Sequence, residues 1–171
     1  QLYKERISNP LIIGFYHNIA SLYFGAEDYL HSLSWLNKIF NDSSLNKDMA
    51  DIHCFAHIMN LIVHFELGNV DLLEYVVRST YRYLYKWDRL YKVENSIMIF
   101  IRKKIPVIIA DKERIEAFKE LKIELEKITK DPFEKKALEY FDFISWAESK
   151  IFDKSFADIV RLKTKKIEAV Q

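Results

Sequence analysis

The chain contains little glycine, proline or cysteine: its 171 residues include three glycines, three prolines and the single Cys54. Folds built from many short strands need turns rich in glycine and proline, so this scarcity predicts an all-α protein. One cysteine cannot form an internal disulfide, which argues against a disulfide-stabilised secreted design and favours a reducing compartment. We therefore expect a cytoplasmic, all-α protein.

The sequence also lacks a dominant charge and any long hydrophobic run. Its 26 basic and 25 acidic side chains leave a net charge of +1, so no global field attracts nucleic acid or an anionic membrane. There is no run of about 18 apolar residues, which predicts no transmembrane helix and no membrane insertion. The first residue is glutamine rather than methionine, within a polar helical pattern, so we expect the C-terminal part of a longer protein.

Apolar residues recur with helical spacing along the chain, and polar stretches separate the runs. The strongest start signal is DPFE at 131–134, with an N-cap, a first-turn proline and an acid. The apolar, β-branched segment 105–111 has no strand to pair with, so we expect a buried connector. The predicted helices, about eight in number, cover 10–25, 28–41, 47–67, 70–87, 90–104, 112–129, 132–151 and 155–165.

Short connections predict that successive helices pack antiparallel as hairpins. The expected hairpins are 10–41, 47–87 and 90–129, followed by capping helices over 132–165, in a single helical-repeat domain. An asparagine with an aromatic residue five positions later recurs in the first helix of each hairpin: Asn18 with Tyr23, Asn60 with Phe65, and Asn95 with Phe100. These echoes lie 42 and 35 residues apart, a period that indicates stacked helix pairs.

The first hairpin carries a recognisable pattern, YHNIASLYFGAEDYLHSLSWLNKIF. Large, large, small and aromatic side chains stand at Tyr16, Ile19, Ala20 and Tyr23, and the second helix continues with Tyr29, Ser32, Leu36 and Ile39. This pattern resembles a tetratricopeptide unit, although Glu27 stands where a turn glycine is usual. The second hairpin keeps Gly68 at its turn and otherwise departs from the pattern. The resemblance implies hairpins stacked as a right-handed superhelix.

The tail of the chain, YFDFISWAESKIFDKSFADIVRLK at 140–163, is similar to the carboxyl end of long bacterial helical-repeat proteins. That similarity brings no known activity with it. It supports the expectation that the chain closes a longer array with capping helices.

The stretch DIHCFAHIMNLIVHFELGN holds three histidines and the only cysteine. On a helix His53, His57 and His64 lie within about 40° of one another and Asn60 joins them, whereas Cys54 points about 100° away from His53. His53 and His57 have the spacing of a helical metal pair, but no third ligand is local. Cys54 also stands where the zinc-protease motif has its general-base glutamate. We therefore predict no metal and no cofactor.

Two interpretations of this polar stripe remain open. It is either an interhelical packing seam, or the lining of a groove that binds a partner peptide or protein. The tetratricopeptide resemblance implies the second, because first helices line the concave surface in that family. The candidate groove residues are His17, Asn18, Ser21, His53, His57, Asn60 and His64.

A second candidate surface is the stretch RSTYRYLYKWDRLYK. Its basic residues, which we call the basic face, are Arg78, Arg82, Lys86, Arg89 and Lys92, with Tyr81, Tyr83, Tyr85, Trp87 and Tyr91 between them. Such a face can bind phosphates and stack bases, or bind an acidic protein. Alternatively, the tyrosines pack between helices and the basic side chains only cover them.

Motifs for catalysis are missing from the sequence, which has no Gly-x-Ser-x-Gly elbow, phosphate-binding glycine loop or dinucleotide fingerprint. Nothing near Cys54 would lower the pKa of its thiol, so we expect it to be a small core residue. We predict a non-enzymatic protein–protein interaction scaffold. The alternative is a helical module that binds nucleic acid through the basic face.

Overall fold

The structure of the protein, a computed structural model, describes residues 9–42 and 49–168. These residues form helices and turns and contain no strand, which confirms the predicted all-α class. The chain divides into two compact units, residues 1–90 and residues 91–171. The predicted helix start at residue 47 and the polar helical pattern at the amino terminus lie outside the described residues.

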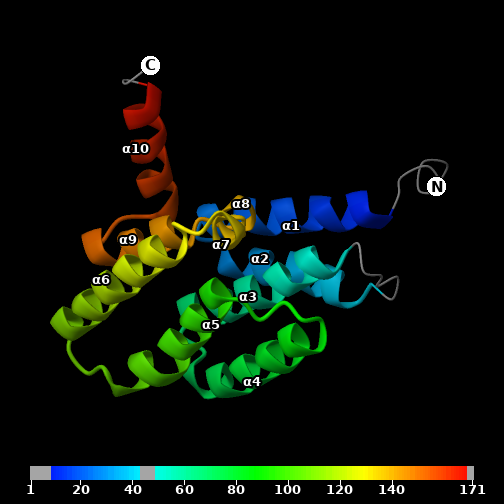
Figure 1. The fold of residues 1–171 in the computed structure, drawn as a ribbon, viewed down its shortest axis with the longest axis horizontal. Coiled ribbons are helices and arrows are strands. Elements are labelled where there is room, and N and C mark those ends of the chain that lie inside the picture. The colour runs from blue at the N-terminus through cyan, green and yellow to red at the C-terminus, as the bar shows by residue number, and fades with distance from the viewer. Residues whose placement is uncertain (1–8, 43–48, 169–171) are drawn as a thin grey trace. The chain divides into compact units, whose positions relative to one another are not determined.

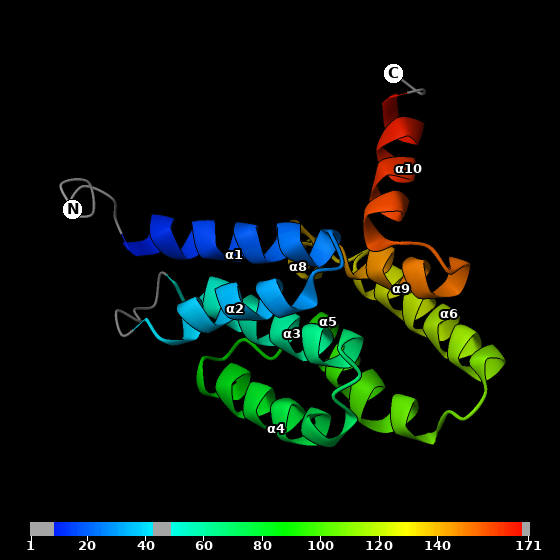
Figure 2. The same cartoon turned by 180° about the vertical axis from the view of Figure 1, so that it is seen from behind.

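Among the described residues, the first unit contains four long helices that pack in chain order (Figures 1 and 2). They are α1 (Asn9–Gly25), α2 (Tyr29–Phe40), α3 (Ala50–Glu66) and α4 (Val70–Lys86). Helix α1 packs on α2, α2 on α3 and α3 on α4, and α1 also contacts α3. This order makes α3 the central helix of the unit, and nine of its residues are buried.

Local signals set the turns of this unit. The Asp28 side chain caps α2 by accepting a hydrogen bond from the His31 backbone N–H at 3.2 Å. Gly68 follows α3 at a φ of +68°, which only glycine adopts at no steric cost. Glu27 stands in the α1–α2 turn with a φ of +60°. It therefore takes the left-handed conformation at a cost of about 1 kcal/mol.

The second unit contains the remaining helices. Helix α5 (Lys92–Ile99) continues into a π-helical turn, η3 (Phe100–Lys104), and a 3₁₀ turn, η4 (Ile105–Val107). After α6 (Asp111–Ile128) come two short helices, α7 (Pro132–Lys135) and α8 (Ala137–Tyr140), then α9 (Phe143–Phe152) and α10 (Phe156–Glu168). Helix α6 packs on α9 and α5, and α9 also packs on α10. The Phe118 ring contacts Trp146 edge to face at a centroid distance of 5.4 Å in the core of this unit.

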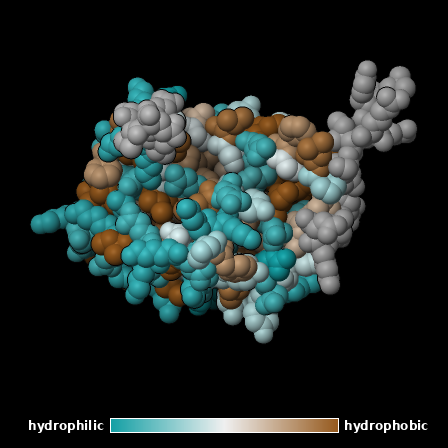
Figure 3. Space-filling view, turned by 45° about the horizontal axis from the view of Figure 1, so that its top comes forward, coloured by the Kyte–Doolittle hydropathy of each residue, from teal (hydrophilic) through white to brown (hydrophobic). Residues whose placement is uncertain are grey.

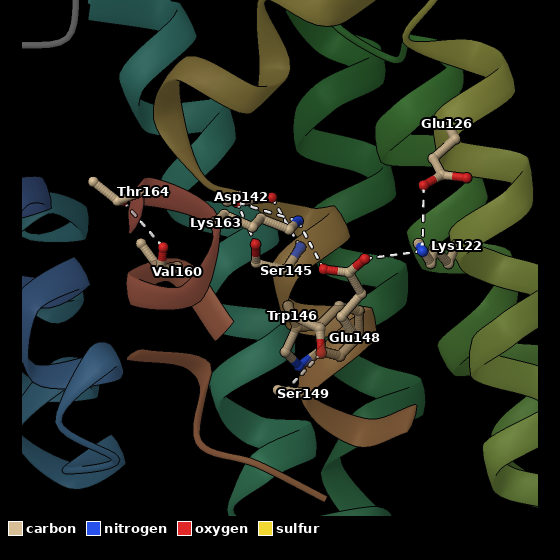
Figure 4. A network of polar contacts seen from close by, with 10 residues as sticks. All are labelled: Lys122, Glu126, Asp142, Ser145, Trp146, Glu148, Ser149, Val160, Lys163 and Thr164. Carbon is tan, nitrogen blue, oxygen red and sulfur yellow. Dashed lines mark hydrogen bonds and ion pairs between the residues drawn. The ribbon is translucent and has the colours of Figure 1, made fainter. Parts of the chain in front are cut away.

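A polar cluster joins three helices of the second unit (Figure 4). The Glu148 carboxylate on α9 lies 2.9 Å from Lys122 Nζ of α6 and 2.8 Å from Lys163 Nζ of α10. Burial would raise the pKa of Glu148, but the hydrogen bonds from Lys163 and Lys122 outweigh it and hold the pKa below its usual value. Because both lysines compensate a mostly buried carboxylate, the cluster fixes α9 between its neighbours.

The prediction of a single helix over 132–151 is wrong, because this range contains three helices, α7, α8 and α9. Phe141 is extended at a φ of −158°, and Asp142 caps a new helix by accepting a hydrogen bond from the Ser145 N–H at 2.8 Å. The Phe141 side chain is buried, so burial of that ring favours the break. The predicted start at 131–134 is confirmed, since the Asp131 carboxylate accepts from the Phe133 N–H at 2.9 Å.

The prediction of a buried connector at 105–111 is also wrong. Val107 and Ile109 are 71% and 97% exposed. Apolar composition predicts burial only where a neighbouring element covers the segment, and in the described chain none covers these two side chains.

Candidate functional site

The histidine stripe of α3 begins in the protein interior. His53 is buried, and its Nε2 atom has no hydrogen-bond partner among the residues that the structure describes. Burial lowers the pKa of His53, and the negative charge of Asp42 opposes that shift. His53 is therefore neutral at physiological pH and belongs to the core rather than to a surface.

His57 lies between two aromatic rings from neighbouring helices. Its ring centroid is 4.6 Å from that of Phe40 on α2 and 4.0 Å from that of Tyr83 on α4. Burial, with a smaller contribution from His53, lowers the pKa of His57 to about 4. A neutral imidazole between two aromatic rings contributes to the packing of the helices. At neutral pH it has no charge through which it could bind an anionic ligand.

The stripe becomes more accessible toward the carboxyl end of α3. Asn60 and His64 are half-buried, and the Asn69 amide Nδ2 donates to His64 Nδ1 at 3.0 Å. Burial lowers the pKa of His64 as well.

The candidate residues on α1 point in different directions. His17 is buried, and the Ser21 hydroxyl donates to the His17 carbonyl at 3.0 Å and lies 3.8 Å from Met59 Sδ of α3. Asn18 is exposed. The structure therefore places Ser21 at the α1–α3 contact and Asn18 on the outside. It does not bring the seven candidate groove residues onto one exposed surface.

Cys54 and Tyr83 lie close together in the same region. Cys54 is buried, and burial followed by the electrostatic influence of Cys54 raises the pKa of Tyr83 to about 12. The phenol of Tyr83 therefore stays protonated at neutral pH, and Cys54 lies in the core. Among residues 9–42 and 49–168, no three His, Cys, Asp or Glu side chains come together in a way that could hold a metal ion.

The basic face is divided in the structure. Arg78 pairs with Glu74 on the same helix, and Arg89 pairs with Asp51 of α3. Lys92 is the first residue of α5 and belongs to the second unit. Three members remain together on α4: Arg78, Arg82 and Lys86.

The tyrosines of α4 separate into an inner and an outer set. Tyr83 packs inward against His57, whereas Tyr81 and Tyr85 stack on each other outside, with ring centroids 6.1 Å apart and planes 13° from parallel. Tyr75 is 67% exposed and shares the outer side by helical spacing. We name this surface the outer face of α4, and its residues are Tyr75, Arg78, Tyr81, Arg82, Tyr85 and Lys86.

Sequence reasoning missed Tyr75, although the signal was present. Tyr75, Arg78 and Arg82 follow one another at helical spacings of three and four residues, and Tyr85 continues the stripe. Elsewhere, the face of the molecule in Figure 3 shows apolar side chains scattered among hydrophilic ones. Scattered exposure of that kind needs no functional explanation, whereas a periodic aromatic stripe does.

No known family matches this chain. Comparison with family models, with curated proteins and with solved structures gives no match. The tetratricopeptide resemblance therefore stays a prediction, and the candidate site rests on its geometry. The described helices include none that is both long enough and apolar enough to cross a membrane.

Proposed function

We propose that the protein is a non-enzymatic interaction module that binds a partner protein through the outer face of α4. The observation that carries this proposal is the exposure of Tyr75 and Tyr85, 67% and 70%, beside basic side chains on one helix face. Tyrosine and arginine are the residues that supply most binding energy at protein interfaces.

The outer tyrosines lie outside the core of the first unit. Helix α4 already buries its opposite side, with Leu73, Val77 and Leu84 against the rest of the unit. Tyr81 and Tyr85 also hold each other in a stacked arrangement, so less side-chain entropy is lost when a partner covers them. An exposed, ordered aromatic pair is therefore better explained by binding than by stability.

The charges of this face favour a partner segment that carries carboxylates next to apolar side chains. Arg82 and Lys86 are exposed and form no ion pair with any residue that the structure describes. Carboxylates on a partner would pair with these cations while apolar side chains cover the tyrosine rings.

Nucleic acid is the second candidate for the same surface, because exposed tyrosines can stack bases. The number of available cations argues against it. Glu74 and Asp51 already engage Arg78 and Arg89, and Lys92 is in the other unit. Since phosphate binding scales with the number of neutralised phosphates, a face with few free cations predicts weak, mildly salt-dependent binding.

The proposed module includes a right-handed, tetratricopeptide-like stacking of its hairpins, which the packing of α1 to α4 in chain order supports. In that family the groove would be lined by α1 and α3. Burial of His17 and His53 argues against a groove at their positions, so we place the partner on α4 instead.

A peptide-display selection with the immobilised protein tests this proposal. We expect enriched peptides to combine acidic and apolar residues, and their affinity to fall about tenfold or more in a Tyr75→Ala plus Tyr85→Ala variant. Phe15→Ala removes a half-exposed ring from α1 and serves as the matched control.

Two results would contradict the proposal. One is equal peptide affinity of the wild-type protein and the tyrosine variant. The other is retention on single-stranded DNA that Arg78→Glu plus Arg82→Glu abolishes, with no peptide enriched. That second result would indicate that the outer face of α4 binds nucleic acid instead of a protein.

A further inference from the structure

The segment from η4 to the start of α6, whose backbone is traced in Figure 1, carries exposed apolar side chains. Ile109 is 97% exposed, the highest value among the large hydrophobic residues that are exposed in the described chain, and Val107 is 71% exposed. Pro106 and Ala110 beside them are exposed as well. Water contact of two branched aliphatic side chains is unfavourable, so a binding partner that covers them would gain free energy.

Basic side chains flank this apolar connection on both sides. Arg102, Lys103 and Lys104 precede it in η3; after it, α6 begins with Asp111, which pairs with Arg114, and continues with Lys112. Lys104 Nζ lies 2.9 Å from the Glu120 carboxylate. Arg102, Lys103 and Lys112 are exposed and have no ion-pair partner among the described residues, so they are available to an anionic ligand.

The connection is held in a defined position. The Glu113 carboxylate accepts hydrogen bonds from the backbone N–H groups of Ile109 at 3.3 Å and Ala110 at 3.4 Å. At its start, Phe100 packs on the buried Phe118 with ring centroids 4.8 Å apart. Because both ends are fixed, binding would not have to order a loose loop.

We propose that this connection and the basic residues beside it bind an anionic lipid surface peripherally. Val107 and Ile109 would enter the interfacial layer, and Arg102, Lys103 and Lys112 would contact lipid phosphates. An almost fully exposed side chain stands out from the surface rather than lining a groove, which suits the boundary of a bilayer. This surface lies in the second unit and is independent of the proposed function of α4.

Vesicle co-sedimentation with the full chain tests the proposal. Vesicles of phosphatidylcholine with about 30 mol % phosphatidylserine should bind the protein, and vesicles of phosphatidylcholine alone should not. We expect Val107→Ser plus Ile109→Ser, and separately Arg102→Glu plus Lys103→Glu, to reduce binding about tenfold or more. Raising the salt concentration from about 0.05 to about 0.5 M should also release the wild-type protein.

Two controls separate this surface from others. Ile123→Ser removes an exposed apolar side chain from α6, and Arg78→Glu plus Arg82→Glu reverses charge on α4. Both should leave vesicle binding unchanged, and circular dichroism should show every variant folded. Three results would overturn the proposal: no binding to the anionic vesicles, wild-type binding by the serine variant, or an equal loss in the α4 variant.

Discussion

Acidification should destabilise the first unit because His57 must stay neutral in the folded protein. Its ring lies between Phe40 and Tyr83, and burial is the main reason that its pKa falls from the ordinary 6.5 to about 4. In the unfolded chain the same imidazole takes up a proton near pH 6.5. Below that pH the unfolded state binds more protons than the folded state, so the free energy of unfolding decreases as the pH falls.

The size of this loss follows from the two pKa values. Between 6.5 and about 4 the complete effect is about 3 kcal/mol, and about 2 kcal/mol of it is lost between about pH 7.5 and about pH 5. Burial also lowers the pKa of His17, His53 and His64. These three groups act in the same direction. On acidification the free energy of unfolding of the wild-type protein should therefore decrease by more than the His57 contribution alone.

Urea denaturation followed by circular dichroism at the two pH values measures the effect. His57→Phe keeps an aromatic ring between Phe40 and Tyr83 but cannot titrate. On acidification its free energy of unfolding should therefore decrease by about 2 kcal/mol less than that of the wild-type protein. Phe15→Leu is the matched control, because the Phe15 ring is half-exposed on α1 and the change removes no titratable group. It should keep the wild-type pH dependence. The same loss in His57→Phe as in the wild type would refute the assignment of a neutral, packed His57.

Three further outcomes are expected. Glu134 accepts hydrogen bonds from the backbone N–H groups that begin α5, so Glu134→Ala should lower the urea-derived stability by about 1–2 kcal/mol, whereas the exposed Glu139→Ala should not. Glu148→Gln should cost about 1–3 kcal/mol by removing the charge that compensates two lysines, and a thermal melt unchanged by this variant would contradict that role. Cys54 is buried, so a thiol reagent should label it slowly in buffer and rapidly in urea, as a chromogenic assay would show.

Much of the helical pattern could be predicted because its signals are local. Caps such as Asp28 and Asp131 and the glycine at 68 act within a turn of the residues they stop or start. The break at Phe141 depends instead on burial of its ring, which local periodicity does not report. The connector at 105–111 shows the same limit, since apolar residues are buried only where a neighbouring element covers them.

For the candidate site, the sequence predicts which residues share one side of a helix, but not which other helices pack against that side. Helical geometry aligns His53 with His57 from sequence alone. Whether that stripe faces a groove or a packed interior depends on Phe40 and Tyr83, which come from two other helices. The inward position of Tyr83 had a local signal, because Thr80 and Val76 precede it at spacings of three and seven residues on the buried side of α4.

The π-helical turn η3 follows α5 and contains Arg102, Lys103 and Lys104. The direction in which these basic residues point depends on the number of residues in this turn. The Ile105 N–H bonds to the Phe100 carbonyl, so this turn holds one residue more than an ordinary α-helical turn. Deleting a single residue from it would restore the α-helix and rotate everything that follows by about 100° relative to α5. A substitution at Arg102 or Lys103 alters one side chain. A one-residue deletion would instead turn the whole connection to another side of α5. In related chains, an insertion or deletion here would therefore alter this surface more than any point substitution.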